Sequence, residues 1–199
     1  MRNPLKSYRR ADSFYDIGNI DGPEFIIGPN DYDLAKRLWK AGTEHRKWMR
    51  QVVVWVAITA PRYWWSEFDT YKIGTSANSE STMHRLTKDG VKEEDIEFAW
   101  GTTLLADNAM RNLIRDINCL IDYYNQCEDS EIKQKTFGLI KALLPEGFVQ
   151  KRTVCLNYEV LATMYKQRKN HRLPQWRETF CEWVNTLPHS EFITGNFDD

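Results

Sequence analysis

The sequence predicts an α+β fold, and three observations carry that prediction. Residues 52–60 form an apolar run rich in Val, Ile and Trp, which is typical of a buried strand. Residues 104–124 and 131–144 instead carry apolar side chains at helical spacing. Strands and helices follow one another in mixed order rather than in a repeating alternation. With 199 residues, of which 42% are apolar, the chain can bury one sizeable core, so we expect a single domain over residues 1–199.

Each element is predicted from its apolar pattern and from the residues that end it. Asn30 or Asp31 can cap the first helix, and Gly42 can end it. Pro61 ends the central strand. The second long helix is predicted to end before Pro145, because a residue before proline rarely stays helical. The predicted segments in chain order are a strand at 24–27, a helix at 32–41, a strand at 50–60, a helix at 62–71, a loop at 74–81, helices at 104–124 and 131–144, a strand at 148–156, and helices at 158–168 and 175–187.

The charge of the chain excludes some classes of partner. Its formal net charge is −1, so nothing global attracts it to nucleic acid or to a membrane surface. The cations are nevertheless concentrated between Phe148 and Arg177, where the acid Glu159 stands against seven basic residues. These are Lys151, Arg152, Lys166, Arg168, Lys169, Arg172 and Arg177. A local basic patch on a neutral protein favours a small anionic ligand over a long polyanion.

The four cysteines, Cys119, Cys127, Cys155 and Cys181, form no Cys-x-x-Cys pair and have no histidines at zinc-ligand spacing, so we expect no metal site. None has the cationic or helix-start surroundings that activate a thiol. Single thiols without a recognisable signal peptide indicate a reducing setting, so we expect a cytoplasmic protein. The apolar run at 52–60 is too short to cross a bilayer, so no membrane partner is expected.

A cluster of hydroxyl and amide side chains lies between the predicted helix at 62–71 and the long helices. It offers several hydrogen-bond donors within a short span, namely Ser76, Asn78, Ser79 and Ser81. Gly74 permits close approach of the backbone to a ligand, and His84 and Arg85 can supply charge-assisted bonds to a phosphate. Such a composition is also typical of a solvated turn, and composition alone leaves both interpretations open.

A second block, at residues 144–177, is cationic. It begins at Leu144-Pro145, continues through Asn157 ahead of a helix that ends near Arg168, and reaches Gln175. An arginine fork can bind a base edge or a phosphate with two parallel hydrogen bonds, and several cations on one face attract a nucleotide. The alternative is a solvated basic helix face, and that alternative stays open for Lys166 and Lys169.

Together the two blocks resemble those of the flavin-dependent thymidylate synthases, whose signature contains a Ser-x-Asn-x-x-Ser core. Ser76, Asn78 and Ser81 match that core, and the second block matches in order and spacing. The family's Arg-His-Arg is replaced here by Tyr71-Lys72-Ile73, and the Arg after the last Ser by Met83. The chain therefore resembles a divergent, phage-like member. This resemblance implies a central, mostly antiparallel sheet flanked by helices.

The resemblance also implies roles for individual residues. Those implied to hold the flavin are Lys72, Ser76, Asn78 and Asn157. Those implied to contact the nucleotide are Glu67, Ser81, His84, Arg85, Lys151, Arg152 and Arg168, with either Lys151 or Arg152 on the phosphate. Arg168 and Ser81 are implied to act at the pyrimidine itself. Glu67 falls near the family's nucleotide-contacting Gln, and its carboxylate can accept a bond from the exocyclic amine that cytosine has and uracil lacks.

The activity implied by the resemblance is one-carbon transfer from methylenetetrahydrofolate to C5 of a pyrimidine deoxynucleoside monophosphate. FAD and NADPH are the implied cofactors, and a homotetramer with shared active sites is the implied assembly. Two outcomes stay open, methylation of dUMP to dTMP and hydroxymethylation of dCMP. The chain has no Pro-Cys dipeptide, so cofactor chemistry fits better than a cysteine nucleophile. A non-catalytic nucleotide-binding protein is the alternative, whereas the neutral charge disfavours a nucleic-acid-binding module.

Overall fold

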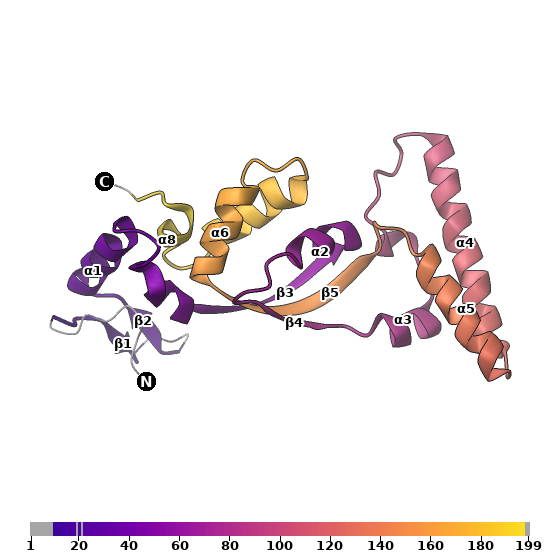
Figure 1. The fold of residues 1–199 in the computed structure, drawn as a ribbon, viewed down its shortest axis with the longest axis horizontal. Helices are drawn as coiled ribbons and strands as arrows, with labels where there is room; N and C mark the ends of the chain where they lie inside the picture. Colours follow the sequence, from indigo (N-terminus) through magenta and orange to yellow (C-terminus); the bar gives the residue numbers. More distant parts are fainter. Residues whose placement is uncertain (1–9, 19, 21, 198–199) are drawn as a thin grey trace. The chain divides into compact units, whose positions relative to one another are not determined.

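The computed structural model describes residues 10–18, 20 and 22–197 of an α+β protein (Figure 1). The chain divides into two compact units. Unit 1 comprises Met1–Trp55, Tyr71–Ser76 and Cys155–Asp199, and unit 2 comprises Val56–Thr70 and Ala77–Val154. That the whole chain acts as one domain stays a prediction.

A three-stranded sheet has the order β3-β5-β4, with β3 at Val53–Pro61, β5 at Val149–Asn157 and β4 at Ser76–Ser79. Two backbone hydrogen bonds show that β3 and β5 are antiparallel. The N–H of Tyr158 donates to the carbonyl of Val52, and the N–H of Arg62 donates to the carbonyl of Phe148. Partner numbers thus rise on one strand as they fall on the other, which confirms the antiparallel sheet.

The structure corrects the predicted loop at 74–81, because β4 occupies part of it. All four residues of β4 are exposed, so no apolar alternation marks the strand in the sequence. Beside it, the N–H of Glu80 donates to the carbonyl of Lys151 at 3.0 Å. Hydrogen bonds to β5, distant in the sequence, therefore form this strand rather than local hydrophobicity.

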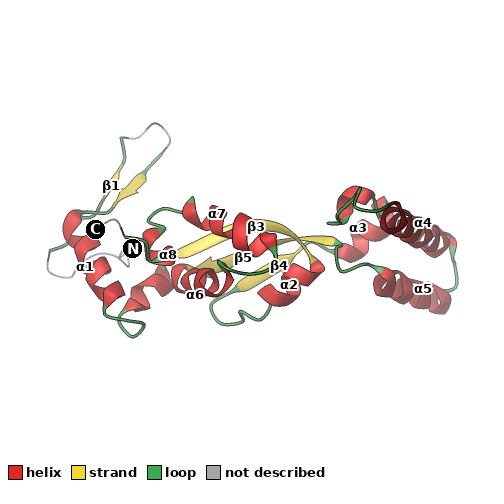
Figure 2. Cartoon of the chain, turned by 90° about the horizontal axis from the view of Figure 1, so that it is seen from above, coloured by secondary structure: helices red, strands yellow, loops and turns green. Residues whose placement is uncertain are grey.

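Unit 1 contains a two-stranded antiparallel hairpin and several helices (Figure 2). Its elements besides parts of the sheet are β1 (Phe14–Asp16), β2 (Glu24–Ile26), α1 (Pro29–Lys40), the 3-10 helix η1 (Arg46–Gln51), α6 (Tyr158–Arg168), the π-helical turn η3 (Gln175–Phe180), α7 (Cys181–Asn185) and α8 (Glu191–Thr194). Helix α6 packs against η1 and α8. Two predicted boundaries differ from the structure. The strand predicted at 50–60 starts later, at Val53, because η1 extends to Gln51, and the predicted last helix starts with a π-helical turn.

The start of α1 also differs from the prediction. Gly28 is the N-cap residue, and Pro29 takes the first helical position, where its missing N–H costs nothing. Asp31 instead lies inside the helix with its side chain fully buried. Its carboxylate accepts bonds from the N–H of Ser13 at 3.0 Å and the N–H of Asp12 at 3.2 Å. Asp31 thus ties the chain before β1 to α1 rather than capping the helix.

Unit 2 is built around a helical hairpin. Its helices are α2 (Arg62–Phe68), α3 (Thr82–Asp89), the 3-10 helix η2 (Glu93–Asp95), α4 (Leu104–Gln126) and α5 (Ser130–Leu143). Helices α4 and α5 lie side by side (Figure 1). Thr103 caps α4 through the N–H of Ala106, and Asp129 caps α5 through the N–H groups of Glu131 and Ile132. Both long helices are confirmed, whereas α3 was not predicted.

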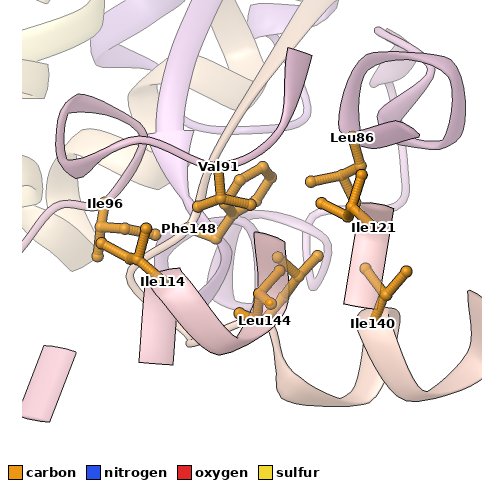
Figure 3. Packing of buried hydrophobic residues seen from close by; sticks show 9 residues of the cluster. Leu86, Val91, Ile96, Ile114, Ile121, Ile140, Leu144 and Phe148 are labelled. Atoms are coloured by element: carbon orange, nitrogen blue, oxygen red, sulfur yellow. The ribbon is translucent and has the colours of Figure 1, made fainter. Parts of the chain in front are cut away.

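The apolar core of unit 2 lies between α3, α4 and α5 (Figure 3). Its buried members are Leu86, Val91, Ile96, Ile114, Ile117, Ile121, Ile140, Leu144 and Phe148. Phe148 stands directly before β5 and is 1% exposed, so the core reaches the start of that strand.

No helix among the described residues is long and apolar enough to cross a membrane.

Candidate functional site

In unit 1, Arg168 at the end of α6 is held between two aromatic rings. Its guanidinium lies 5.6 Å from the ring centroid of Tyr71 and 4.9 Å from that of Trp176, which is fully buried. Its Nε donates to the Tyr71 hydroxyl at 3.0 Å, and that hydroxyl donates to Oε1 of Gln167 at 2.7 Å. The aromatic contacts and the hydrogen bond fix a half-buried planar cation at the helix end.

The segment Tyr71–Ser76 lies beside helix α6. Tyr71 meets α6 at its C-terminal end, and Gly74 meets it at its N-terminal end. Gly74 has a φ of 78°, and a Cβ there would lie 2.9 Å from Val160 Cγ2 and 3.1 Å from Asn157 Nδ2. Only glycine fits this approach without strain. Lys72 stands between these two contacts with an exposed side chain, and Ser76 follows, also exposed.

Asn157 caps α6, because its Oδ1 accepts from the N–H of Val160 at 3.1 Å. The cap uses the oxygen of the amide and leaves Nδ2 as a donor beside Gly74. Unit 1 therefore gathers four of the predicted residues around α6 and the segment beside it. They are Lys72, Ser76, Asn157 and Arg168.

Unit 1 also holds a cavity of about 710 Å³. Aromatic and apolar side chains form most of its wall, including Phe25, Trp48, Pro188 and Phe192. His189 lies at the same cavity with a φ of 53°, a conformation that residues other than glycine rarely adopt. A cavity of this size with a mostly apolar wall is typical of a small-molecule site.

In unit 2, the hydroxyl-amide block continues into α3. Ser81 is the N-cap residue of α3, but its hydroxyl makes no capping bond. The side chains of Asn78, Ser81 and His84 are all exposed. The part of the Ser-x-Asn-x-x-Ser block that lies in unit 2 therefore exposes hydroxyl, amide and imidazole groups to solvent.

Arg85 lies two residues after Met83, the last position of the family signature, and its side chain is already paired. It forms an ion pair with Asp95, whose side chain is 10% exposed, and a longer one of 3.9 Å with Glu80. Its guanidinium also lies 5.8 Å from the ring centroid of Phe148. These contacts anchor α3 to η2 and to the core of unit 2.

Lys151 and Arg152 differ sharply in their surroundings. Lys151 is exposed, whereas the side chain of Arg152 is only 16% exposed. Arg152 pairs with Asp69 and lies over the ring of Trp65. Glu67 stands two residues before Asp69 near the end of α2 and is half-buried. Unit 2 thus places Glu67 and Arg152 at the same helix end.

Lys141, near the end of α5, is a cation that the sequence prediction missed. Burial lowers the pKa of its ammonium, and the positive charge of Arg62 lowers it further. Arg62 donates from Nη1 to the carbonyl of Leu144 at 2.9 Å. Lys141 and Arg62 therefore form a local concentration of positive charge in unit 2. Lys141 lies three residues before Leu144, outside the block at 144–177, so the charge pattern of that block did not indicate it.

The described residues contain no group of three His, Cys, Asp or Glu that could hold a metal ion. The four cysteines are free thiols. Burial raises the pKa of Cys181, which disfavours the thiolate form that attacks carbon.

Comparison with known proteins gives a clear fold. No protein-family model matches the chain, and no curated protein matches it. Among solved structures, it is similar to the flavin-dependent thymidylate synthase ThyX of Helicobacter pylori complexed with FAD and dUMP. That match has a TM-score of 0.66 and 15% identity over 86% of this chain and 85% of the other. A second structure of the same enzyme, also with FAD and dUMP, gives a TM-score of 0.67 and 16% identity, covering 84% and 83%.

A third similar structure is the UMP/dUMP methylase PolB from Streptomyces cacaoi, bound with 5-Br UMP. Its TM-score is 0.53 at 16% identity, over 84% of this chain and 83% of that one. At such identities the likeness concerns the fold. The chain has the fold of the flavin-dependent thymidylate synthases, which confirms the fold predicted from its two sequence blocks.

Proposed function

We propose, from the thymidylate synthase fold of this chain, that it is a flavin-dependent enzyme that transfers one carbon to C5 of a pyrimidine deoxynucleoside monophosphate. The observation that carries the proposal is the fixed arginine at the end of α6. Arg168 is held by Tyr71 and Trp176 on the helix that Asn157 caps. The similar ThyX structure contains FAD and dUMP, and the PolB structure contains 5-Br UMP.

The cofactor in this proposal is FAD, which when bound supplies the redox chemistry that the side chains lack. The donors available to it fit an anionic dinucleotide. Lys72 supplies a cation, Ser76 and Asn78 supply exposed donors, and Asn157 supplies the Nδ2 that its capping bond does not use. The mostly apolar cavity of unit 1 is the space proposed for its ring system. NADPH is the proposed reductant and methylenetetrahydrofolate the proposed carbon donor.

The nucleotide in this proposal is bound by cations and hydroxyls. Arg168 faces the pyrimidine, where its planar fork can donate to a carbonyl oxygen as charge develops on the ring. Ser81, in unit 2, is proposed to donate a hydroxyl bond to a pyrimidine or its sugar. His84, Arg85, Lys151 and Arg152 are the residues proposed for the phosphate, and Lys151 is the exposed cation among them. We further propose a homotetramer whose subunits share active sites.

The choice between dUMP and dCMP turns on Glu67. A carboxylate accepts hydrogen bonds only, so it favours the amine of cytosine over the carbonyl of uracil. Replacement of the Arg-His-Arg of the thymidylate synthases by Tyr71-Lys72-Ile73 also indicates an altered site. Hydroxymethylation of dCMP is therefore proposed beside methylation of dUMP, as in a phage-like enzyme that modifies pyrimidines.

One competitive incubation tests the proposal. The protein is given dUMP and dCMP together with FAD, NADPH and methylenetetrahydrofolate, and the nucleotides are analysed by mass spectrometry. A methyl gain on dUMP or a hydroxymethyl gain on dCMP identifies the reaction. The Arg168→Ala variant is the control, and it should lose the product while remaining folded. No product with either nucleotide contradicts the enzymatic proposal.

The second candidate is a nucleotide-binding protein without catalysis on the same fold. Tyr71 favours it, because a neutral phenol stands where the thymidylate synthases carry a cation. The absorbance of bound flavin separates the two candidates. Purified protein that retains or takes up FAD supports the enzyme, whereas nucleotide binding without flavin supports the binding protein.

A further inference from the structure

The end of helix α2 in unit 2 carries a cluster of charged and aromatic side chains. Arg152 donates from Nη1 to both carboxylate oxygens of Asp69, at 2.9 and 3.1 Å. Its Nη2 donates to Oε1 of Gln150 at 3.2 Å. The guanidinium lies 4.3 Å from the ring centroid of Trp65. The cluster therefore joins the C-terminal end of α2 to strand β5 by charge, hydrogen bonds and stacking.

Trp65 strengthens the same junction. It is 1% exposed, and its indole Nε1 donates to the carbonyl of Gln150 at 3.0 Å. The N–H of Asp69 closes the helix by donating to the carbonyl of Trp65 at 2.8 Å. Asp69 is thus held by its backbone to the helix and by its carboxylate to Arg152 on the strand.

This arrangement suits a support better than a ligand contact. The side chain of Arg152 is 16% exposed, its Nε is buried with no hydrogen-bond partner among the described residues, and its two Nη atoms are both bonded. A phosphate that took this guanidinium would have to replace Asp69 and leave the stack on Trp65. Lys151, its neighbour on β5, is instead exposed. A mostly buried cation costs free energy unless it is paired, so the Asp69 pair keeps Arg152 in place.

Glu67 connects the cluster to the proposed site. It lies two residues before Asp69, and its carbonyl accepts from the Thr70 hydroxyl at 2.7 Å and from the Thr70 N–H at 3.3 Å. The turn that contains Glu67 is therefore the turn that Asp69 fixes to β5. Movement of this turn by a fraction of an ångström would misplace the Glu67 carboxylate against a base.

We infer that Arg152 and Asp69 are positioning residues, which clamp the end of α2 onto β5 so that Glu67 is held for recognition of the pyrimidine base, while Lys151 is the cation for the phosphate. This inference rests on the proposed function, because it assumes that a pyrimidine nucleotide binds. It differs from the family resemblance in the part assigned to Arg152. Trp65, Asp69 and Arg152 act together through Glu67 and touch no substrate.

The test compares each nucleotide with its nucleoside. Dissociation constants of dCMP, deoxycytidine, dUMP and deoxyuridine are measured by NMR titration, which reaches millimolar affinities. Arg152→Lys and Asp69→Asn should each weaken the nucleotide and the nucleoside with the preferred base by the same factor, about five- to twentyfold. The ratio of nucleotide to nucleoside affinity should stay unchanged. Lys151→Ala should lower that ratio and leave nucleoside binding as it was.

Two further measurements complete the design. Asp33→Asn breaks an exposed Arg–Asp pair of unit 1, with Arg37, and is the matched control that should change nothing. Hydrogen exchange of the Asp69 and Thr70 amides should accelerate in Arg152→Lys and Asp69→Asn, which demonstrates release of the helix end in a folded protein. Accelerated exchange together with the equal loss of both affinities supports the inference.

Other outcomes overturn it in distinguishable ways. If Arg152→Lys weakens only the nucleotide, Arg152 is itself the phosphate ligand. If neither ligand is weakened, the cluster does not position the base contact. If the unaltered protein binds no pyrimidine nucleotide or nucleoside, the proposed function fails before any variant is compared, and the inference fails with it.

Discussion

Tyr71 and Arg168, distant in the sequence, are joined by a hydrogen bond of 3.0 Å and by a cation–π contact. The phenol oxygen accepts from Nε of Arg168 and donates to Gln167, so it holds both residues at the end of α6. Tyr71 therefore orients the guanidinium of Arg168. Tyr71 stands where the thymidylate synthases carry a cation.

Tyr71→Phe removes the hydroxyl and keeps the ring. Because Arg168 then loses the bond that orients it, nucleotide affinity should fall by about 1 kcal/mol, or roughly fivefold. The melting temperature should change little, since the lost bond lies at a partly exposed helix end. Isothermal titration with dUMP and dCMP measures the effect. A rise in affinity would show instead that Tyr71 restrains Arg168 from the ligand.

Arg168 itself offers a sharper comparison. Arg168→Ala should weaken nucleotide binding by about 1–3 kcal/mol, the size of a lost charged hydrogen bond. Arg168→Lys keeps the charge but loses the planar fork and the stacking on Trp176, so it should restore only part of that loss. Full recovery by lysine would mean that only charge matters there. Loss of stability without loss of affinity would make Arg168 structural.

The sequence predicted the parts of the molecule whose causes are local. Helix α6 matches its predicted range, and α4 and α5 match closely, because apolar spacing and capping residues act within each helix. Arg168 was selected by the order of its block, and its role at the nucleotide stays a prediction. Strand β4 was missed because its residues are polar and its partner strand is distant in the sequence. The pairing of Arg152 with Asp69 was unpredictable for the same reason, since only the folded chain brings them together.

Asn157 can be divided into its two functions. Asn157→Ala should cost about 1 kcal/mol of unfolding free energy, because α6 loses its cap. Asn157→Asp keeps the capping oxygen and removes the Nδ2 donor, so its stability should be close to that of the unaltered protein. If Nδ2 binds the flavin as proposed, the Asn157→Asp variant should still retain less FAD. Denaturant unfolding and flavin fluorescence measure the two effects, and equal flavin retention in Asn157→Asp would remove the residue from the cofactor site.

Lys141 should trade stability against binding. Because burial and Arg62 disfavour its charged form, Lys141→Met should raise the free energy of unfolding slightly near neutral pH. The same change should weaken nucleotide binding if the ammonium faces the phosphate. In the unaltered protein, binding should also decline as pH rises through the lowered lysine pKa, since the ammonium is lost there. The Lys135→Met variant, on an exposed face of the same helix, is the control. An unchanged affinity in Lys141→Met would exclude a phosphate contact.

Tyr158 predicts how the stability of unit 1 depends on alkaline pH. Burial raises its pKa to about 12 from the ordinary 10.0, and Glu191 adds to the shift. Its hydroxyl donates to the carbonyl of Pro188, a bond that requires the proton. A raised folded-state pKa means that the contribution of the protonated tyrosine to stability is complete below about pH 10 and is lost as pH rises toward 12. Tyr158→Phe should therefore be less stable than the unaltered protein at pH 8, and its stability should fall less steeply between pH 10 and 12. Thermal unfolding of both proteins across this range measures the difference, and parallel curves would show that Tyr158 does not control the alkaline transition.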